Sequence, residues 1–221
     1  MDLSKQSKKE ISSLFFKNCC LETNSASYLI CDALYSTPCE KKQLVEKILQ
    51  KNKNLNNIRV TIYDLQSKNL IKFPNGLLEL TDIGRWHYVA TRIGVSISSL
   101  CLLSQTYVIQ KSLEHKGYVG YFAIAFFADI VKYSHSIVKL IRNLREAGLI
   151  YRHHKNTIRI FPEKIKILEN YDAELTSLNK WIVELKSKIE NIENSDHVAR
   201  KNFIKDLECY AKLHKSVTYY E

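Results

Sequence analysis

A pattern of three helical segments followed by a β-hairpin occurs twice in this chain of 221 residues, and it limits the possible folds more than any other feature. In each copy, apolar residues recur at the three- and four-residue spacing of amphipathic helices, and two short apolar runs separated by turn residues follow them. The two copies lie about 80 residues apart. The repetition predicts two small domains of the same kind in tandem.

The first copy has a hairpin with a strong turn signal. Pro74-Asn75-Gly76 separates its two strands, and Asn-Gly is typical of hairpin turns because both residues tolerate positive φ. The third helix should bury Ile58, Ile62 and Leu65, which share one helical face. The predicted elements are helices at 25–35, 40–49 and 57–68, strands at 70–73 and 77–80, and a further helix at 82–92, capped by Thr81.

The second copy ends its third helix with a clear stop signal. Gly148 follows the helix at the position where a left-handed residue closes the last turn. Ile137, Leu140, Ile141 and Leu144 lie on one face of this helix and should point into the core. The predicted elements are helices at 100–115, 121–131 and 135–147, and strands at 150–152 and 157–160 around a basic tip at 153–156.

Two strings at the ends of the third helices carry a resemblance to a known family. The string Leu-Arg-Glu-Ala-Gly-Leu-Ile at 144–150 resembles the close of a winged-helix recognition helix. The string at 65–71, together with Leu-Thr-Asp-Ile-Gly-Arg at 80–85, is similar to the recognition helix and wing of winged-helix regulators of the MarR and PadR kind. The resemblance implies a mainly helical α+β fold with small hairpin wings, as in such regulators or in plasmid-type replication initiators.

The chain then divides into three parts. Residues 1–94 form the first winged-helix domain, with an N-terminal arm helix at 8–21, and residues 95–167 form the second. In residues 168–221 apolar positions are separated by alternating steps of three and four, which is the pattern of a coiled-coil seam. This seam could pair with a second copy of the chain or with a last helix after residue 195, and we favour dimerisation. The residues that would make the dimer contact are Leu175, Leu178, Ile182, Leu185, Ile189 and Ile192.

Charge and composition favour an intracellular nucleic-acid-binding protein. The net charge is +10, and all of the positive excess lies in residues 1–168. The longest apolar stretch, 118–131, is shorter than the roughly 20 residues that a membrane-spanning helix needs. The six cysteines show no paired spacing, which is typical of a reduced compartment. We therefore expect a cytoplasmic protein associated with the nucleoid.

No catalytic or metal-binding pattern is recognisable. The chain lacks a glycine-rich phosphate loop, and the adjacent His153 and His154 have no cysteine pair nearby to complete a tetrahedral site. No Ser-His-Asp or Cys-His arrangement follows from the spacing. We expect no enzyme activity, no metal and no cofactor.

The outward faces of the two third helices and the second wing are the candidate DNA contacts. Arginine and lysine can bond guanine or phosphate, and asparagine and glutamine can bond adenine. The second helix carries more cations, so the second unit is expected to be the stronger DNA binder. The candidate residues are Asn56, Arg59, Tyr63, Gln66, His135, Ser136, Lys139, Arg142, Arg145, Arg152, Lys155 and Arg159.

The expected function is sequence-specific binding of double-stranded DNA by a homodimer, as a transcription regulator or a replication initiator. One alternative is a winged-helix scaffold subunit of a chromosome-organising or transcription complex, for which the apolar segment 121–127 would supply a protein-binding surface. Another is a regulator that responds to a small molecule held by aromatic residues between the units. The localised positive charge favours nucleic acid over both.

Overall fold

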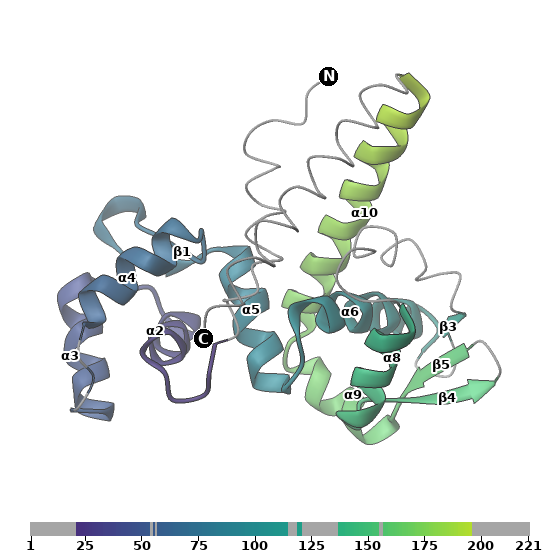
Figure 1. Ribbon diagram of the computed structural model, residues 1–221, viewed down its shortest axis with the longest axis horizontal. Helices are drawn as coiled ribbons and strands as arrows, with labels where there is room; N and C mark the ends of the chain where they lie inside the picture. The colour runs from purple at the N-terminus through teal and green to yellow at the C-terminus, as the bar shows by residue number, and fades with distance from the viewer. Residues whose placement is uncertain are drawn as a thin grey trace, which may run out of the picture. The chain divides into compact units, whose positions relative to one another are not determined.

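The computed structural model describes residues 21–53, 55, 57–114, 119–120, 137–154 and 157–195. The chain divides into two compact units, with the boundary between Ile97 and Ser98. Both are mainly helical, and each carries a small antiparallel sheet (Figure 1), so the predicted α+β class is confirmed at this level. The predicted arm helix, the helix at 121–131, the wing tip at 155–156 and the last helix after residue 195 lie outside the described residues.

The first unit follows the predicted order of elements. Its third helix buries Ile58, Ile62 and Leu65, as the apolar spacing predicts. Two hydroxyl caps fix helix starts: Ser25 accepts from the Tyr28 N–H at 3.1 Å, and Thr81 caps the last helix of the unit. The elements are α2 (Ala26–Ser36), α3 (Lys41–Lys51), α4 (Ile58–Ser67), β1 (Ile71–Lys72), η2 (Pro74–Gly76), β2 (Glu79–Leu80) and α5 (Asp82–Ile93).

The hairpin of the first unit turns where the sequence predicts. Asn75 and Gly76 take φ values of 50° and 82°, in the left-handed region, and β1 pairs with β2. One further pairing was not predicted. Cys39, between α2 and α3, forms an antiparallel bridge with Leu78, and each backbone N–H donates to the other residue's carbonyl. The bridge extends the hairpin by a third extended segment.

The second unit contains two elements that the sequence did not predict, β3 and α9. The α6 helix also begins three residues before its predicted start and ends three residues before its predicted end, at Ser112. The elements are α6 (Ile97–Ser112), β3 (Val119–Gly120), α8 (Ile137–Glu146), β4 (Ile150–His154), β5 (Thr157–Ile160), α9 (Pro162–Glu169) and α10 (Asp172–Ser195).

The α6 helix is buried on nearly all of its faces and supports the sheet of the second unit. Two of its buried polar side chains bond within the helix, since Ser104 and Thr106 donate to carbonyl oxygens one turn earlier. The amide oxygen of Gln110 accepts the backbone N–H of Ile160 at 2.7 Å, which links α6 to β5. A helix surrounded in this way fixes the strands that follow α8.

The α4 and α8 helices end with the same hydrogen bond. In the first unit the Leu70 N–H donates to the Leu65 carbonyl oxygen at 2.9 Å, and in the second the Leu149 N–H donates to the Leu144 carbonyl oxygen at 3.0 Å. Both are the bonds that close a helix around a left-handed residue. The equivalent positions lie about 80 residues apart, as the repeat in the sequence predicts.

The left-handed residue in these two helix ends is Asn69 in the first unit and Gly148 in the second. Their φ values are 58° and 66°. Glycine and asparagine are the residues that adopt this conformation at low cost. The chain therefore leaves both helices in the same direction and continues into the first strand of the hairpin.

The sheets of the two units also share their order. In the second unit the strands lie in the order β3-β5-β4, so the segment before α8 pairs with the last strand. In the first unit the Cys39 bridge lies beside Leu78, next to β2, and β2 pairs with β1. In both units, an extended segment that precedes the hairpin pairs with the second strand of the hairpin or with the residue just before that strand.

The C-terminal seam is helical, and its first part is buried within one chain. Leu175, Leu178 and Ile182 on α10 are at most 1% exposed. A second copy of the chain is not needed to remove these side chains from water. The side chains of Leu185, Ile189 and Ile192 lie outside the described ones.

Among the described helices, no single one is long and apolar enough to cross a membrane. Taken together across the break between them, α5 and α6 have sufficient length and apolar composition.

Candidate nucleic-acid interface

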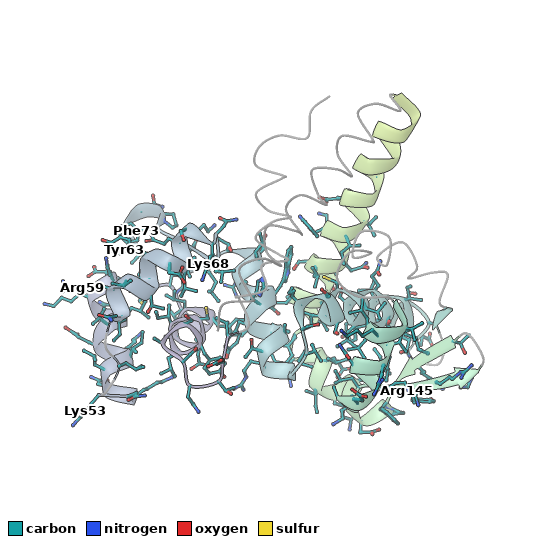
Figure 2. The ribbon with its side chains drawn as sticks, viewed as in Figure 1. Lys53, Arg59, Tyr63, Lys68, Phe73 and Arg145 are labelled. Carbon is teal, nitrogen blue, oxygen red and sulfur yellow. The ribbon has the colours of Figure 1, made fainter. Side chains whose placement is uncertain are left out.

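The α4 helix exposes the face opposite its core residues. Because Ile62 and Leu65 point into the unit, Arg59 and Tyr63 lie in solvent and Gln66 is half-buried. Figure 2 shows Arg59 and Tyr63 on the outer margin of the first unit. Three of the predicted contacts therefore come from one helix, whereas the fourth, Asn56, lies outside the described residues.

Tyr63 is in contact with a lysine from α3. The Lys41 Nζ lies 4.1 Å from the centroid of the tyrosine ring, which is a cation–π distance. The hydrogen bond and the positive charge of Lys41 lower the pKa of Tyr63 below its usual value. Tyr63 nevertheless keeps 61% of its surface exposed, so most of the ring remains available to a ligand.

Several lysines of the first unit are engaged by carboxylates, whereas Arg59 is not. The ion pairs are Lys51–Asp32 at 2.9 Å, Lys68–Asp64 at 2.7 Å and Lys72–Glu79 at 2.8 Å. Within the described part of the first unit, Arg59 makes no ion pair. Its guanidinium is the cation on α4 that is available to an anionic ligand without first losing an internal partner.

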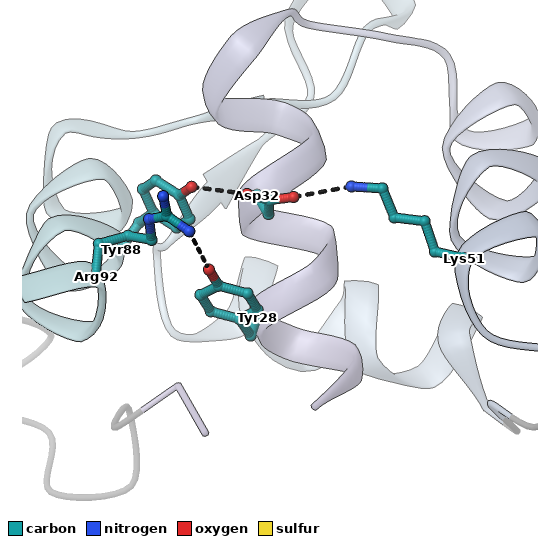
Figure 3. A network of polar contacts seen from close by, with 5 residues as sticks. All are labelled: Tyr28, Asp32, Lys51, Tyr88 and Arg92. Carbon is teal, nitrogen blue, oxygen red and sulfur yellow. Dashed lines mark hydrogen bonds and ion pairs between the residues drawn. The ribbon is translucent and has the colours of Figure 1, made fainter. Parts of the chain in front are cut away.

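A polar network holds α2, α3 and α5 together behind this face (Figure 3). Asp32 accepts from the Tyr88 hydroxyl at 2.7 Å and from the Lys51 Nζ at 2.9 Å, and the Arg92 Nη1 donates to the Tyr28 hydroxyl at 3.1 Å. Burial raises the pKa of Tyr88, and the bond to Asp32 raises it further. The network fixes the end of α3 from which the chain continues to α4.

The α8 helix also exposes the face opposite its core residues. Leu140 and Leu144 are fully buried, and Lys139, Arg142 and Arg145 are exposed. His135 and Ser136, which were predicted to begin this face, lie outside the described residues. The described part of the helix therefore places the three predicted basic side chains on its outer surface.

Arg142 has an internal partner that the sequence analysis overlooked. Its Nε donates to the Glu146 Oε1 at 2.8 Å, one helical turn away, and this bond raises the pKa of Arg142. Both side chains are largely exposed, so the pair contributes little to stability. It does place a negative charge beside the cation. Arg145 makes no ion pair within the described residues.

An open hollow of about 620 Å³ lies between α8 and the first strand of the second hairpin. We call it the arginine hollow. Three of its lining residues are arginines, one is acidic and two are aromatic, and the rings of Tyr151 and Phe161 are 4.9 Å apart. Its lining residues are Arg142, Arg145, Glu146, Ile150, Tyr151, Arg152 and Phe161.

The remaining predicted contacts, on the second hairpin, differ in whether they line the hollow. Arg152 is exposed and lines the hollow, whereas Arg159, on β5, is half-buried and does not. Lys155 lies outside the described residues. Within the described part of the chain, no group of three histidine, cysteine or acidic residues could hold a metal ion. Three cysteines in this part are buried, namely Cys31, Cys39 and Cys101.

No family model, curated protein or solved structure matches this chain, so its function has to be inferred from its own residues and their geometry.

Proposed function

We propose that this protein is a sequence-specific double-stranded-DNA-binding protein with two winged-helix units, which acts as a dimer in transcription regulation or in the initiation of replication. The observation that carries the proposal is the arginine hollow between α8 and β4. Three guanidinium groups line it, and Arg145 has no internal anion within the described residues. Guanidinium groups bond phosphate oxygens and guanine edges in two-bond geometry.

The order of elements supports the winged-helix part of the proposal. In the first unit α4 leads directly into a hairpin, in the second unit α8 does so, and in each an earlier extended segment pairs with the second strand of that hairpin or with the residue beside it. This arrangement places the outward face of the helix next to the hairpin. A helix of this size fits the major groove of duplex DNA, and the adjacent hairpin can then contact the backbone.

The proposal is tested by titrating the full-length protein into a fluorescently labelled duplex and following anisotropy at several salt concentrations. The logarithm of affinity should fall linearly with the logarithm of salt, with a slope of about −0.9 per phosphate neutralised. Selection from a random duplex pool then supplies a preferred site. Binding that hardly changes with salt would exclude the proposal and favour the protein-scaffold alternative.

Arg145→Ala is the most informative substitution in this assay. If Arg145 contacts a base, affinity for the preferred site should fall by about 1–3 kcal/mol and discrimination at one position should relax. If it contacts phosphate, all duplexes should be weakened equally and the salt slope should drop by about one. The matched control is Lys180→Ala, which removes an exposed cation from α10 that does not line the hollow. An equal loss in both variants would mean that only net charge matters.

Dimerisation is tested separately by sedimentation of the full-length protein. A dimer is expected at micromolar concentration. Leu178→Asp is unsuitable as the disrupting variant because Leu178 is fully buried within one chain and the aspartate would destabilise the fold. Val183, which is 50% exposed on the same helix, is the better position, and Val183→Asp should weaken a dimer that uses the outer face of α10. A monomeric wild-type protein would remove dimerisation from the proposal.

A further inference from the structure

The outer margin of the first unit exposes large apolar side chains beside its cations. Val60 and Tyr63 on α4 are 64% and 61% exposed, and Phe73 and Leu77, on either side of the hairpin turn, are 51% and 40% exposed. We call these four residues the aromatic edge. Figure 2 shows Tyr63 and Phe73 along this margin. Exposed apolar side chains gathered on one element and the adjacent turn indicate a surface that binds a ligand.

The second unit differs at the equivalent helix positions. When α4 and α8 are aligned on their shared ends, Val60 corresponds to Lys139 and Tyr63 corresponds to Arg142. At these two positions the second unit presents charge where the first presents an aliphatic and an aromatic side chain, whereas at the position of Arg59 the second unit has the exposed Val138. The two helices have the same ending, but α4 is suited to apolar groups of a ligand and α8 to its negative charges.

Two cations lie near the Tyr63 end of the aromatic edge. Lys41 lies over one side of the Tyr63 ring, and Arg59 is exposed one turn before Tyr63 on the same helix. A ligand for this surface must combine flat apolar groups with negative charge. An unpaired nucleotide strand has both, because its bases are free to stack and its backbone is anionic.

We propose that the aromatic edge of the first unit binds single-stranded DNA, with unpaired bases stacked on Tyr63 and Phe73 and the backbone held by Arg59. The inference rests on the proposed function in that the ligand is DNA, and it adds that the two units bind different forms of it. Paired bases are stacked on one another, so their faces cannot reach an aromatic side chain. The principal contact with the duplex is α8, on which Lys139, Arg142 and Arg145 are exposed.

The test uses the full-length protein and a labelled thymidine oligonucleotide of about ten nucleotides, a length within the usual site sizes for single strands. Tyr63→Ala should weaken binding of this probe by roughly 5- to 150-fold, the effect of losing one base stack. Tyr63→Phe keeps the ring and should stay within about twofold of wild type. Phe73→Ala should resemble Tyr63→Ala. The control is Leu113→Ala, another exposed apolar side chain, which lies on the second unit.

The duplex probe, measured with the same variants, separates the two proposals. Tyr63→Ala should weaken the single strand by a larger factor than it weakens the duplex, because only unpaired bases can stack on the ring. If wild type binds duplex but not the single strand, or if Tyr63→Ala and Phe73→Ala bind the single strand like wild type, this inference is wrong while the proposed function stands. If wild type binds neither probe, both fail. A change in sedimentation of Tyr63→Ala without DNA would instead identify the edge as a contact between copies of the chain, and would overturn the inference.

Discussion

The α4 and α8 helices are alike where they end and different where they face solvent. Each ends in a buried leucine, a left-handed residue and a hydrogen bond from the following leucine to the last turn. On the outer face, α4 carries Arg59, Val60 and Tyr63, whereas α8 carries Val138, Lys139 and Arg142 at the same three positions. The helix ends depend on buried and backbone groups, which are the same in both units.

The comparison shows that the residues that determine the fold of a unit differ from the residues that determine which ligand it can bind. The buried leucine and the left-handed residue determine how the chain passes from helix to hairpin, and they place no demand on the exposed positions. Exposed helix positions usually change stability by no more than about 0.5 kcal/mol, so they are free to differ. The same frame can therefore present an aromatic surface in one unit and a basic surface in the other.

The largest expected effect comes from truncating the shared leucines. Leu65 and Leu144 are at most 2% exposed, and replacing either with alanine should lower the free energy of unfolding by about 2–5 kcal/mol. Each unit has its own fluorescent reporter, Trp86 in the first and Trp181 in the second. Urea denaturation in Trp181→Phe and Trp86→Phe backgrounds would follow one unit at a time.

The expected result is that each leucine variant shifts mainly the transition of its own unit. The control is the same pair of single-tryptophan proteins without the leucine substitution. If Leu65→Ala shifts both transitions equally, the units unfold as one cooperative body, and the description of two units that are stabilised separately is wrong.

A smaller effect is expected where the first unit has a contact that the second lacks. Gly84, in the first turn of α5, lies against Leu70, and a Cβ added there would overlap the Leu70 carbonyl oxygen. Gly84→Ala should therefore destabilise the first unit by about 2–3 kcal/mol, despite the better helix propensity of alanine. Trp86 fluorescence in the Trp181→Phe background measures the shift.

The matched control lies in the first turn of α9. Lys164 holds the equivalent place in the second unit, and Lys164→Ala should stay within about 0.5 kcal/mol of wild type. If Gly84→Ala leaves the free energy of unfolding unchanged, α5 can shift away from the hairpin. The close approach of Gly84 to Leu70 would then not be required for the stability of the first unit.

The order of helices and hairpins was predictable from the sequence because it depends on local signals. Apolar spacing located α2, α3, α4 and α8, and Asn75-Gly76 located the first turn. The strand β3 and the Cys39 bridge were missed because a segment of one or two residues has no period to detect. Their pairing is decided by partners far along the chain.

Two features of the candidate site differ in how they could have been found. The pairing of Arg142 with Glu146 follows from a four-residue helical spacing, so the sequence contained the signal. The network around Asp32 joins residues up to 64 positions apart, and nothing in the sequence brings Tyr28 to Arg92. The seam on α10 was visible as an apolar stripe, but its pattern did not indicate that the first part would be covered within one chain.

Each unit contains an aspartate that accepts from a tyrosine and a lysine, and these aspartates should make stability depend on pH. Burial raises the pKa of Asp32, but the bonds from Lys51 and Tyr88 outweigh it, so the pKa lies below its usual value. The bond from Lys111 lowers the pKa of Asp172. A carboxylate with a lowered folded-state pKa stabilises the protein above its unfolded pKa, and this stability is lost as pH falls below about 4.

Asp32→Asn and Asp172→Asn should each cost about 1 kcal/mol or less at neutral pH, because the side chains are partly exposed. The cost should shrink at pH 3, where wild type loses the same charge. Urea denaturation at both pH values measures it. An equal loss at pH 3 and pH 7 would show that the carboxylate charge is not what stabilises the two networks.

The smallest expected effect concerns the one acidic residue in the arginine hollow. Glu146 corresponds to Ser67 in the first unit, so Glu146→Ser gives α8 the first unit's residue at this position. The substitution frees Arg142 and removes a negative charge that a DNA phosphate would meet. At separations of several ångströms in water, one such charge changes the binding free energy by a few tenths to about 1 kcal/mol. Duplex affinity should therefore rise about threefold at low salt, and the gain should fade as salt increases.

Anisotropy titration at two salt concentrations measures this gain in affinity, with the reciprocal Ser67→Glu as the control. The aromatic edge on α4 is proposed to stack unpaired bases, and α8 is proposed as the principal contact with duplex DNA. Ser67→Glu should therefore weaken duplex binding less than Glu146→Ser strengthens it. A larger loss in Ser67→Glu would mean that α4, and not α8, is the principal contact with duplex DNA.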